Sequence, residues 1–308
     1  MKILVTGGAG FVGSHVVRAL LAEGHEVTVL DNLSTGSWDN VPVGDLHSWT
    51  MDLRGTRARR EIGFCRFDAI VHLAGQTSEK VSLKDPYYDA DENLMGTVNL
   101  LEAARQSGSP RIVMASSAAV YGDVAQSRLP LSEETPLLPR SFYGFTKMAA
   151  EHYLALYHRN YGLPYVSLRL PNVYGERQGE AGEGGVISIF ARSIAQGEDI
   201  VIFGDGEQTR DFIYAGDVAS GILAALRTEQ VNTEYNLATR TETSLNQLVH
   251  LFAEVSGKDT EPHYGEARKG DILRSVLDNE KAKEGLGWEP KVSLKEGLAR
   301  TYDYFARK

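Results

Sequence analysis

The feature that most constrains this chain is a glycine-rich turn between two hydrophobic segments near its start. Residues 2–6 predict a short buried strand, and Gly7, Gly10 and Gly13 follow at intervals of three. Glycines at these places allow a tight turn, a close approach of the backbone to a pyrophosphate, and close packing of the next helix. That helix, expected over residues 12–22, would point its first N–H groups at the phosphates. This order of elements predicts a dinucleotide site.

A second hydrophobic strand, expected over residues 27–30, ends in Asp31. An acidic side chain at that place can accept hydrogen bonds from the adenosine ribose, and it would repel the 2′-phosphate of NADP. The sequence therefore predicts NAD as the cofactor.

Composition and charge exclude several classes of protein. A length of 308 residues allows one large or two modest domains. The net charge of −9, without any basic run, argues against nucleic acid or an anionic membrane as partner. A strand that starts at Lys2 leaves no room for a signal peptide, and no apolar run spans a bilayer. The single Cys65 suits a reducing compartment, and the eight histidines lack metal-ligand spacing. We expect a cytoplasmic protein without a metal.

Strands and helices alternate through the first half of the chain, which is typical of a doubly wound α/β fold. Further strands are expected over residues 48–51, 69–73, 111–115 and 165–170, and helices over 87–106 and 142–160. We predict a parallel, Rossmann-type sheet as an NAD-binding domain over residues 1–170, with a return near 211–236. Residues 171–308 would form a smaller, interlaced substrate domain.

Tyr143 and Lys147 lie four residues apart in the helix expected over 142–160, so they share one face of it. A phenol ionises near about pH 10, and a nearby ammonium lowers that pKa. Ser116 and Ser117 end the strand before it, at the sheet edge where parallel sheets bind ligands. These residues predict an acid–base site beside the dinucleotide.

Short motifs in a fixed order extend this pattern along the chain. They occupy residues 6–13, 31–36, 52–53, 72–75, 93 with 96–97, 116–122, 143 with 147, 171–175, 203–212, 270–271 and 286–290. Over essentially its whole length the chain resembles the extended short-chain dehydrogenase/reductases, within the NAD-dependent epimerase/dehydratase family that acts on nucleotide sugars.

The resemblance implies a role for each matching residue. Ser117, Tyr143 and Lys147 would be catalytic. The residues at NAD would be Gly7, Gly10, Phe11, Val12, Gly13, Asp31, Asn32, Ser34, Thr35, Gly36, Asp52, Leu53, Leu73, Ala74, Gly75, Asn93, Tyr143 and Lys147. The residues at the sugar nucleotide would be Ser117, Tyr143, Asn172, Gly185, Val186, Arg210, Arg268, Asp271 and Ser275. The helices near 93–106 and 142–160 would pair across the two-fold axis of a homodimer.

The activity implied is the 4-epimerisation of a UDP-sugar through a transient 4-keto form, with NAD tightly bound. Dehydratases and decarboxylases of the family carry acidic residues where this chain has Ala118 and Ala119. UDP-glucuronate 4-epimerisation stays open because Arg177 could pair with a uronate carboxylate, although an ion pair with Glu176 or Glu180 would explain it equally. A dehydratase, a decarboxylase and a non-catalytic NAD-binding sensor on the same fold also stay open. The small Ser275, four places after Asp271, would admit N-acetylated sugars beside UDP-glucose and UDP-galactose.

Overall fold

Seven parallel strands form the central sheet, as the alternating pattern predicted. The computed structural model describes residues 1–179, 184–258, 260–267 and 272–308. The strands are β1 (Lys2–Thr6), β2 (Glu26–Asp31), β3 (His47–Thr50), β4 (Ala69–His72), β5 (Arg111–Ser117), β6 (Tyr165–Leu170) and β11 (Thr233–Asn236). Their order is β11-β6-β5-β4-β1-β2-β3. The direction of winding reverses between β1 and β4, and such a reversal is where open α/β sheets bind ligands.

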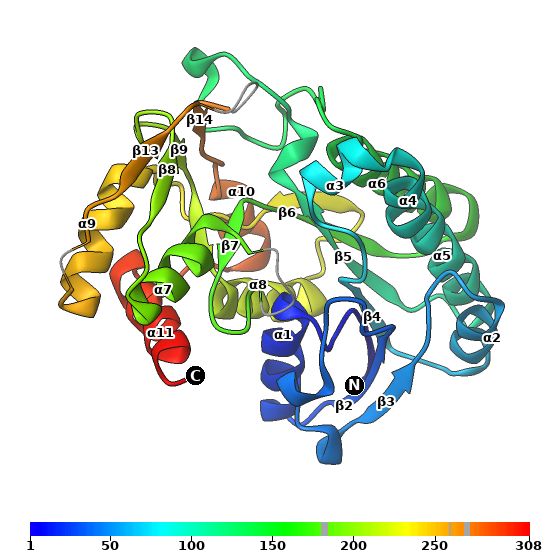
Figure 1. Cartoon of the computed structure of the whole chain (residues 1–308). Helices are drawn as coiled ribbons and strands as arrows, with labels where there is room; N and C mark the ends of the chain where they lie inside the picture. The colour runs from blue at the N-terminus through cyan, green and yellow to red at the C-terminus, as the bar shows by residue number, and fades with distance from the viewer. Residues whose placement is uncertain (180–183, 259, 268–271) are drawn as a thin grey trace.

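The sheet is covered by helices on both faces, and alternate residues of its strands serve two hydrophobic cores. Ile3 and Val5 pack on the side of α1 (Phe11–Ala22) and α8 (Ala215–Arg227). Leu4 packs on the opposite side, which α2 (Thr56–Phe64), α5 (Gly96–Gln106) and α6 (Phe142–Tyr161) cover (Figure 1). This double burial explains why the strand segments are hydrophobic almost throughout.

The helix predicted over residues 87–106 is interrupted. It consists of α4 (Pro86–Ala90), a π-helical turn η3 (Asp91–Met95) and α5, and a short α3 (Glu79–Lys84) precedes it. Apolar spacing continues through the π-turn, so the sequence pattern did not reveal it. Such turns are rare and occur frequently at functional sites. This one contains Asn93. Short 3₁₀ turns cover Trp38–Asn40, Val43–Asp45, Ala118–Val120 and Gln126–Arg128.

The rest of the second half has its own hydrophobic core, between α7 (Val186–Gln196), α9 (Leu245–Ser256) and α11 (Leu294–Ala306). Its strands are β7 (Asn172–Tyr174), β8 (Val201–Phe203), β9 (Thr209–Arg210), β10 (Phe212–Tyr214), β12 (Thr243–Ser244), β13 (His263–Gly265) and β14 (Arg274–Ser275), and α10 spans Glu280–Leu286. They pair as β10-β7, β13-β8 and β12-β9-β14.

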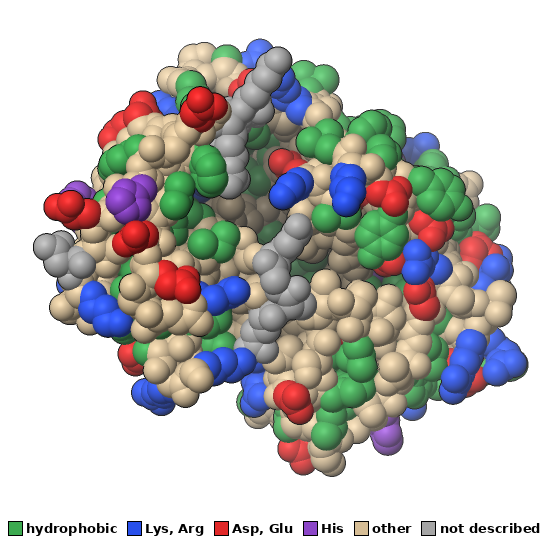
Figure 2. Space-filling model, viewed as in Figure 1, with side chains coloured by type: hydrophobic (Ala, Val, Ile, Leu, Met, Phe, Trp, Pro, Cys, Tyr) green, Lys and Arg blue, Asp and Glu red, His purple; other side chains and the backbone are tan. Residues whose placement is uncertain are grey.

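The two halves interlace, because β11 joins the large sheet beside β6. This placement falls within the predicted return near residues 211–236, while the domain boundary at residue 170 stays a prediction. Figure 2 shows a hollow between the part built on the large sheet and the part that holds α7 and α9. Within the described residues, every helix is too short or too polar to cross a membrane.

Candidate active site

The turn after β1 is a cradle made of backbone. Gly7 has a positive φ of +69°, and a Cβ there would stand 2.7 Å from the Ala74 nitrogen. A Cβ at Gly13 would stand 2.1 Å from the Gly7 carbonyl oxygen. No side chain fits at either place. The N–H groups of Phe11 and Val12, at the start of α1, are therefore not covered by a side chain from these two positions. The predicted dinucleotide site therefore has the required shape.

Asp31 fastens this turn to the end of β2. The Ala9 N–H donates to Asp31 Oδ2 at 3.0 Å, and the Leu33 N–H donates to Oδ1 at 2.8 Å. Burial raises the pKa of this carboxyl, while the two backbone donors oppose the rise. Because a carboxylate has about four acceptor positions, two remain for ribose hydroxyls. Asp31 thus fits both a structural role and the predicted ribose contact.

The predicted adenosine side lies next to Asp31. Asn32 Oδ1 accepts the Ser34 N–H at 3.0 Å, and the loop through Thr35 brings Gly36 so close that a Cβ would meet the Ala9 carbon at 2.9 Å. Leu53 is buried. Asp52 is bound by Arg54, which holds the pKa of that carboxyl to about 2.

Sequence reasoning missed Arg54, which also pairs with Asp91 at 2.7 Å and Glu92 at 3.0 Å. The signal available for it was the acidic excess of residues 85–92, which no basic residue within that segment balances. The pairs connect the loop after β3 with the π-turn.

A second cradle lies at Gly75, which follows Leu73 and Ala74 after β4. A methyl group added to Gly75 would stand 2.6 Å from Asn93 Oδ1 and 3.8 Å from Lys147 Nζ. Asn93 Oδ1 is buried and has no hydrogen-bond partner in the described part of the chain. Lys147 Nζ donates to the Ala115 carbonyl oxygen at 3.1 Å. The cradle therefore offers one acceptor and one donor side by side, which suits a polar ligand such as a ribose.

Ser117 and Tyr143 meet at the end of β5. Ser117 lies close enough to the phenol to favour its ionised form, and the Ser117 hydroxyl oxygen accepts the Ala119 N–H at 3.1 Å. Ser141 caps α6 by accepting the Gly144 N–H at 3.0 Å, so Tyr143 lies in the first turn of the helix. Tyr143 and Lys147 are each 9% exposed.

The predicted lowering of the Tyr143 pKa is wrong for the protein alone. Burial raises the pKa of the phenol to about 12, and the charges of Glu79 and Asp89 add to this, against the Ser117 hydrogen bond. Lys147 Nζ lies 5.9 Å from the phenol ring centroid, and burial lowers the pKa of Lys147 to about 8. Desolvation is thus the largest cause of both pKa shifts.

The predicted substrate residues come from several small elements. Asn172 is exposed at the start of β7, and Gly185 and Val186 begin α7. Arg210 donates to the carbonyl oxygens of Thr209 at 2.8 Å and Ile272 at 2.6 Å. Ser275 on β14 stands opposite Arg210 on β9. Arg268 and Asp271 lie outside the described residues.

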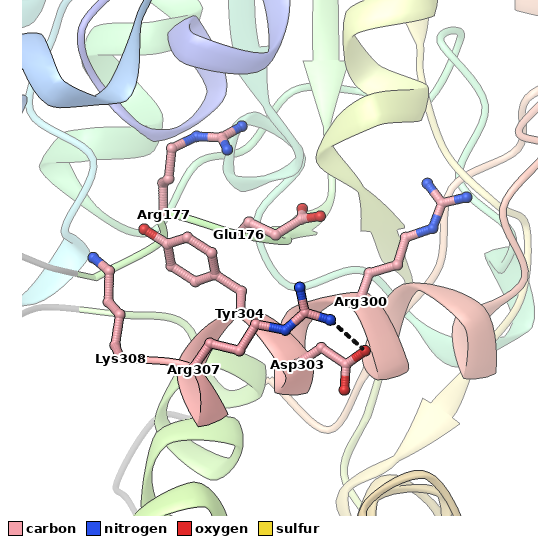
Figure 3. Close-up of a pocket in the computed structure, with 7 residues that line it drawn as sticks. All are labelled: Glu176, Arg177, Arg300, Asp303, Tyr304, Arg307 and Lys308. Carbon is pink, nitrogen blue, oxygen red and sulfur yellow. Dashed lines mark ion pairs between the residues drawn. The ribbon is translucent and has the colours of Figure 1, made fainter.

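Two acidic or basic residues near these elements have defined partners. The Asp211 carboxylate accepts hydrogen bonds from the Thr239 hydroxyl and the Arg240 backbone N–H. Arg177 donates to the Ser14 hydroxyl in α1 at 2.7 Å and lines a pocket with Arg300 and Tyr304 of α11 (Figure 3). Arg177 therefore contacts α1, which covers the face of the sheet opposite to α6.

The sheet order, the glycine cradle and the Ser117–Tyr143–Lys147 group define an enzyme of the dinucleotide-dependent, short-chain dehydrogenase/reductase class. Residues 3–238 match the model of the NAD dependent epimerase/dehydratase family, and the chain belongs to that family. This membership confirms NAD as the predicted cofactor.

Similar proteins cover the chain from end to end. A UDP-glucose 4-epimerase from Mycolicibacterium smegmatis is 39% identical, over 100% of this chain and 99% of the relative. The structure of a UDP-glucose 4-epimerase from Thermotoga maritima with UDP-glucose is 42% identical, with a TM-score of 0.96 over 100% and 99% of the two chains. That of the Thermus thermophilus UDP-glucose 4-epimerase with NAD is 43% identical, with a TM-score of 0.90 over 99% of both.

Other activities occur among the matches. A UDP-glucuronic acid decarboxylase from Xenopus tropicalis is 36% identical, over 100% of this chain and 72% of the relative. Membership of the family therefore fixes the fold and the cofactor but leaves the reaction and the sugar to be argued from the site.

Proposed function

We propose that this chain is a UDP-sugar 4-epimerase that interconverts UDP-glucose and UDP-galactose, and accepts their N-acetyl forms, with NAD held tightly. The observation that carries the proposal is that the end of β5 with Ser117 meets the start of α6 with Tyr143 and Lys147, at the sheet edge that also holds the glycine cradle. The similar proteins named as UDP-glucose 4-epimerases support it.

Each of the three catalytic residues would have a separate role. Ser117 orients the sugar 4-hydroxyl, Tyr143 Oη takes its proton and later returns it, and Lys147 holds the nicotinamide ribose. NAD, when bound, supplies a reversible hydride acceptor for C4 and a positive charge. Because burial, together with the charges of Glu79 and Asp89, keeps the Tyr143 pKa at about 12, we infer that the phenol becomes an effective base only in the loaded site.

The residues after Ser117 favour epimerisation over elimination or decarboxylation. Ala118 and Ala119 form a 3₁₀ turn whose only polar contact with the Ser117 hydroxyl is the backbone N–H of Ala119. A dehydratase needs a further acid and base for the loss of water. Neither alanine can move a second proton, so the reaction that fits is the return of the 4-keto form to a 4-hydroxyl.

Charge around Tyr143 favours a sugar without a carboxylate. Ser141 donates to Glu79 Oε1 at 3.2 Å, which holds a negative charge beside the start of α6. A uronate would add a like charge there, and Arg177, the cation considered for it, lies against α1. We therefore expect the site to disfavour UDP-glucuronate relative to uncharged sugars.

We further propose that two copies pair through α5 and α6. Large apolar side chains are exposed along α6 at Phe142 (48%), Phe145 (53%), Tyr153 (37%) and Leu156 (47%). Their spacing of three, eight and three residues places them along one stripe of the helix. A second copy of the stripe would bury them. Leu156→Glu should convert a dimer to a monomer in analytical ultracentrifugation, and a wild-type monomer would refute the pairing.

The test of the activity is Tyr143→Phe, which removes only the ionisable oxygen. We expect kcat for UDP-galactose to fall by about three orders of magnitude, with NAD retained when bound nucleotide is released and measured. Tyr153→Phe, on the exposed side of the same helix, is the matched control and should leave kcat unchanged. Tyr143→Phe activity above a few per cent, or free NADH accumulating stoichiometrically with product, would contradict the proposal.

The choice of sugar needs its own experiment. Wild type and Glu79→Gln should be compared on UDP-glucose, UDP-N-acetylglucosamine and UDP-glucuronate. We expect UDP-glucuronate to be the poorest substrate, with its kcat/KM raised selectively by Glu79→Gln. Equal use of all the sugars by wild type would remove the argument from charge.

A further inference from the structure

A buried carboxylate, Asp89, lies next to residues of the candidate site but has no part in the proposed reaction. Asp89 in α4 is 0% exposed. Its Oδ1 accepts from Gln76 Nε2 at 2.6 Å and Asn93 Nδ2 at 3.1 Å, and its Oδ2 accepts from Thr146 Oγ1 at 2.9 Å. All these donors are uncharged. Asp89 is therefore a buried negative charge that its hydrogen bonds satisfy but do not neutralise.

The hydrogen bonds of Asp89 decide which way the Asn93 amide points. A carboxylate only accepts, so the amide nitrogen must face it, and the same nitrogen donates to the Gln76 carbonyl oxygen at 3.0 Å. Asn93 Oδ1 is consequently turned the other way, toward the cradle at Gly75. There it is buried without a partner among the described residues, within reach of the same point as Lys147 Nζ.

The Lys147 ammonium is the buried positive charge that corresponds to Asp89. Its Nζ bonds a carbonyl oxygen, and no carboxylate lies within ion-pair distance of it in the described ranges. The titratable groups that face it are His72 from β4, Tyr143 and Glu151 from α6, and Asp89 from α4. Glu151 is already paired with the buried Arg169 at 2.7 Å. Asp89 remains as the counter-charge, because it bonds Thr146, the neighbour of Lys147 in α6, and also Asn93, whose Oδ1 lies near the same point at Gly75 as Lys147 Nζ.

We propose that Asp89 is a positioning residue for NAD, which holds Lys147 as an ammonium through its charge and keeps Asn93 Oδ1 turned toward the cofactor through its hydrogen bonds. The proposal deepens the proposed function, because it rests on Lys147 holding the nicotinamide ribose. It assigns the hydrogen-bonded group of Gln76, Asp89, Asn93 and Thr146 to cofactor binding and not only to packing.

Two variants separate the charge from the geometry. In Asp89→Asn the new amide oxygen can still accept hydrogen bonds from Gln76 and Asn93, and the new amide nitrogen can donate to Thr146 Oγ1. The Thr146 hydroxyl can then donate its own proton to the Tyr143 carbonyl oxygen, which lies 3.0 Å away. Only the charge is lost. Thr146→Val keeps the charge of Asp89 and loses the hydrogen bonds of the Thr146 hydroxyl with Asp89, Tyr143 and Asn93. Asp89→Ser removes the same charge with a smaller side chain and replaces Asp89→Asn should that variant not fold.

The readout is the release of NAD, which needs no sugar and no turnover. Each variant is made in the Tyr143→Phe background, so that the phenol does not titrate, and exchange of bound NAD for isotope-labelled NAD is followed from about pH 6 to about pH 10. Release should accelerate as Lys147 loses its proton. We expect the midpoint of this rise to move down by about one pH unit in Asp89→Asn and to stay at the parental value in Thr146→Val.

Removing the negative charge takes away a group that favours the ammonium, so Lys147 should lose its proton at lower pH. Superimposable pH profiles of Asp89→Asn and its parent, or an equal displacement by Thr146→Val, would overturn the proposal. Because no epimerisation is measured, failure of the proposed activity leaves this result readable. Conversely, an active epimerase with an unchanged NAD profile in Asp89→Asn rejects only the role of Asp89.

Discussion

The nucleotide side and the sugar side of the candidate site are built in different ways. The predicted NAD residues come mainly from loops at the ends of consecutive parallel strands, at Gly7–Gly13, Asp31–Gly36, Asp52–Leu53 and Leu73–Gly75. The predicted sugar residues come from short strands and a helix start scattered between Asn172 and Ser275. The first side is organised by one large sheet and the second by the packing of several small ones.

The comparison teaches where sequence patterns carry structural meaning. Parallel strands of one sheet bring their carboxyl ends to the same edge, so local motifs there meet automatically. Nothing comparable brings Arg210 and Ser275 together, because their contact depends on the parallel pairing of β9 with β14, strands of two residues each. We therefore expect single backbone changes on the nucleotide side to affect NAD binding strongly. Substitutions on the sugar side should mainly change which UDP-sugar is accepted.

The largest effect should come from Gly13→Ala. A Cβ there would overlap the Gly7 carbonyl oxygen at 2.1 Å, so the turn must open and its N–H groups must leave their places. We expect no NAD to remain bound after purification. Gly44→Ala, at a glycine with nothing within 4 Å, is the control. Normal NAD content in Gly13→Ala, measured by absorbance of the released nucleotide, would break the idea of a backbone cradle.

Asp31→Ala should have the next largest effect. It removes the carboxylate that accepts from Ala9 and Leu33 and that is predicted to bind the ribose. Hydrogen bonds to a charged group contribute about 1.5–3 kcal/mol, so NAD should bind at least about tenfold more weakly by calorimetry. The exposed Asp45→Ala is the control. An unchanged dissociation constant for NAD would show that Asp31 does not bind the cofactor and only ends the strand.

Acid should weaken the nucleotide side through two buried histidines. Burial lowers the pKa of His15 to about 4 and that of His72 to about 3. Both stay neutral in the folded protein while the unfolded chain takes up protons below about pH 6.5. The stability from these groups is therefore present above that pH and is lost as the pH falls toward about 4. The melting temperature should drop over this window.

His15→Gln should make that drop shallower, whereas the exposed His250→Gln in α9 should not. Differential scanning calorimetry between about pH 7.5 and about pH 5 decides the matter. A melting temperature that stays level across the window in wild type would show that the histidines are not held neutral.

The smallest effect, and the one that sharpens the sugar side, is expected from Ser275→Tyr. The tyrosine ring is much larger than the serine side chain and should exclude an N-acetyl group. We expect kcat/KM for UDP-N-acetylglucosamine to fall at least about tenfold, while kcat/KM for UDP-glucose changes little. Ser275→Ala, which preserves the small size, should keep both sugars. Equal turnover of the acetylated sugar by Ser275→Tyr and wild type would mean that another residue lines this part of the pocket.

Much of the fold could be predicted because strand and helix periodicities in the first half are local and strong. The π-turn at Asp91–Met95 escaped because it preserves the apolar spacing of a continuous helix. Arg54 and Asp89 were missed because their partners lie in distant segments, and isolated charged residues carry no pattern. The direction of the Tyr143 pKa shift was wrong because spacing along a helix says nothing about how deeply a pair is buried.

The sequence by itself determined the glycine turn, the strand that ends in Asp31 and the Tyr143–Lys147 pair, because each depends on residues that are close together in the chain. Only the tertiary structure decided that Arg177 lies against α1, and that Asn93 faces the cradle with an unpartnered oxygen among the described residues. It also decided that Asp89 is buried and accepts hydrogen bonds from Gln76, Asn93 and Thr146. Desolvation and long-range charge act through space, so they exist only once the chain has folded.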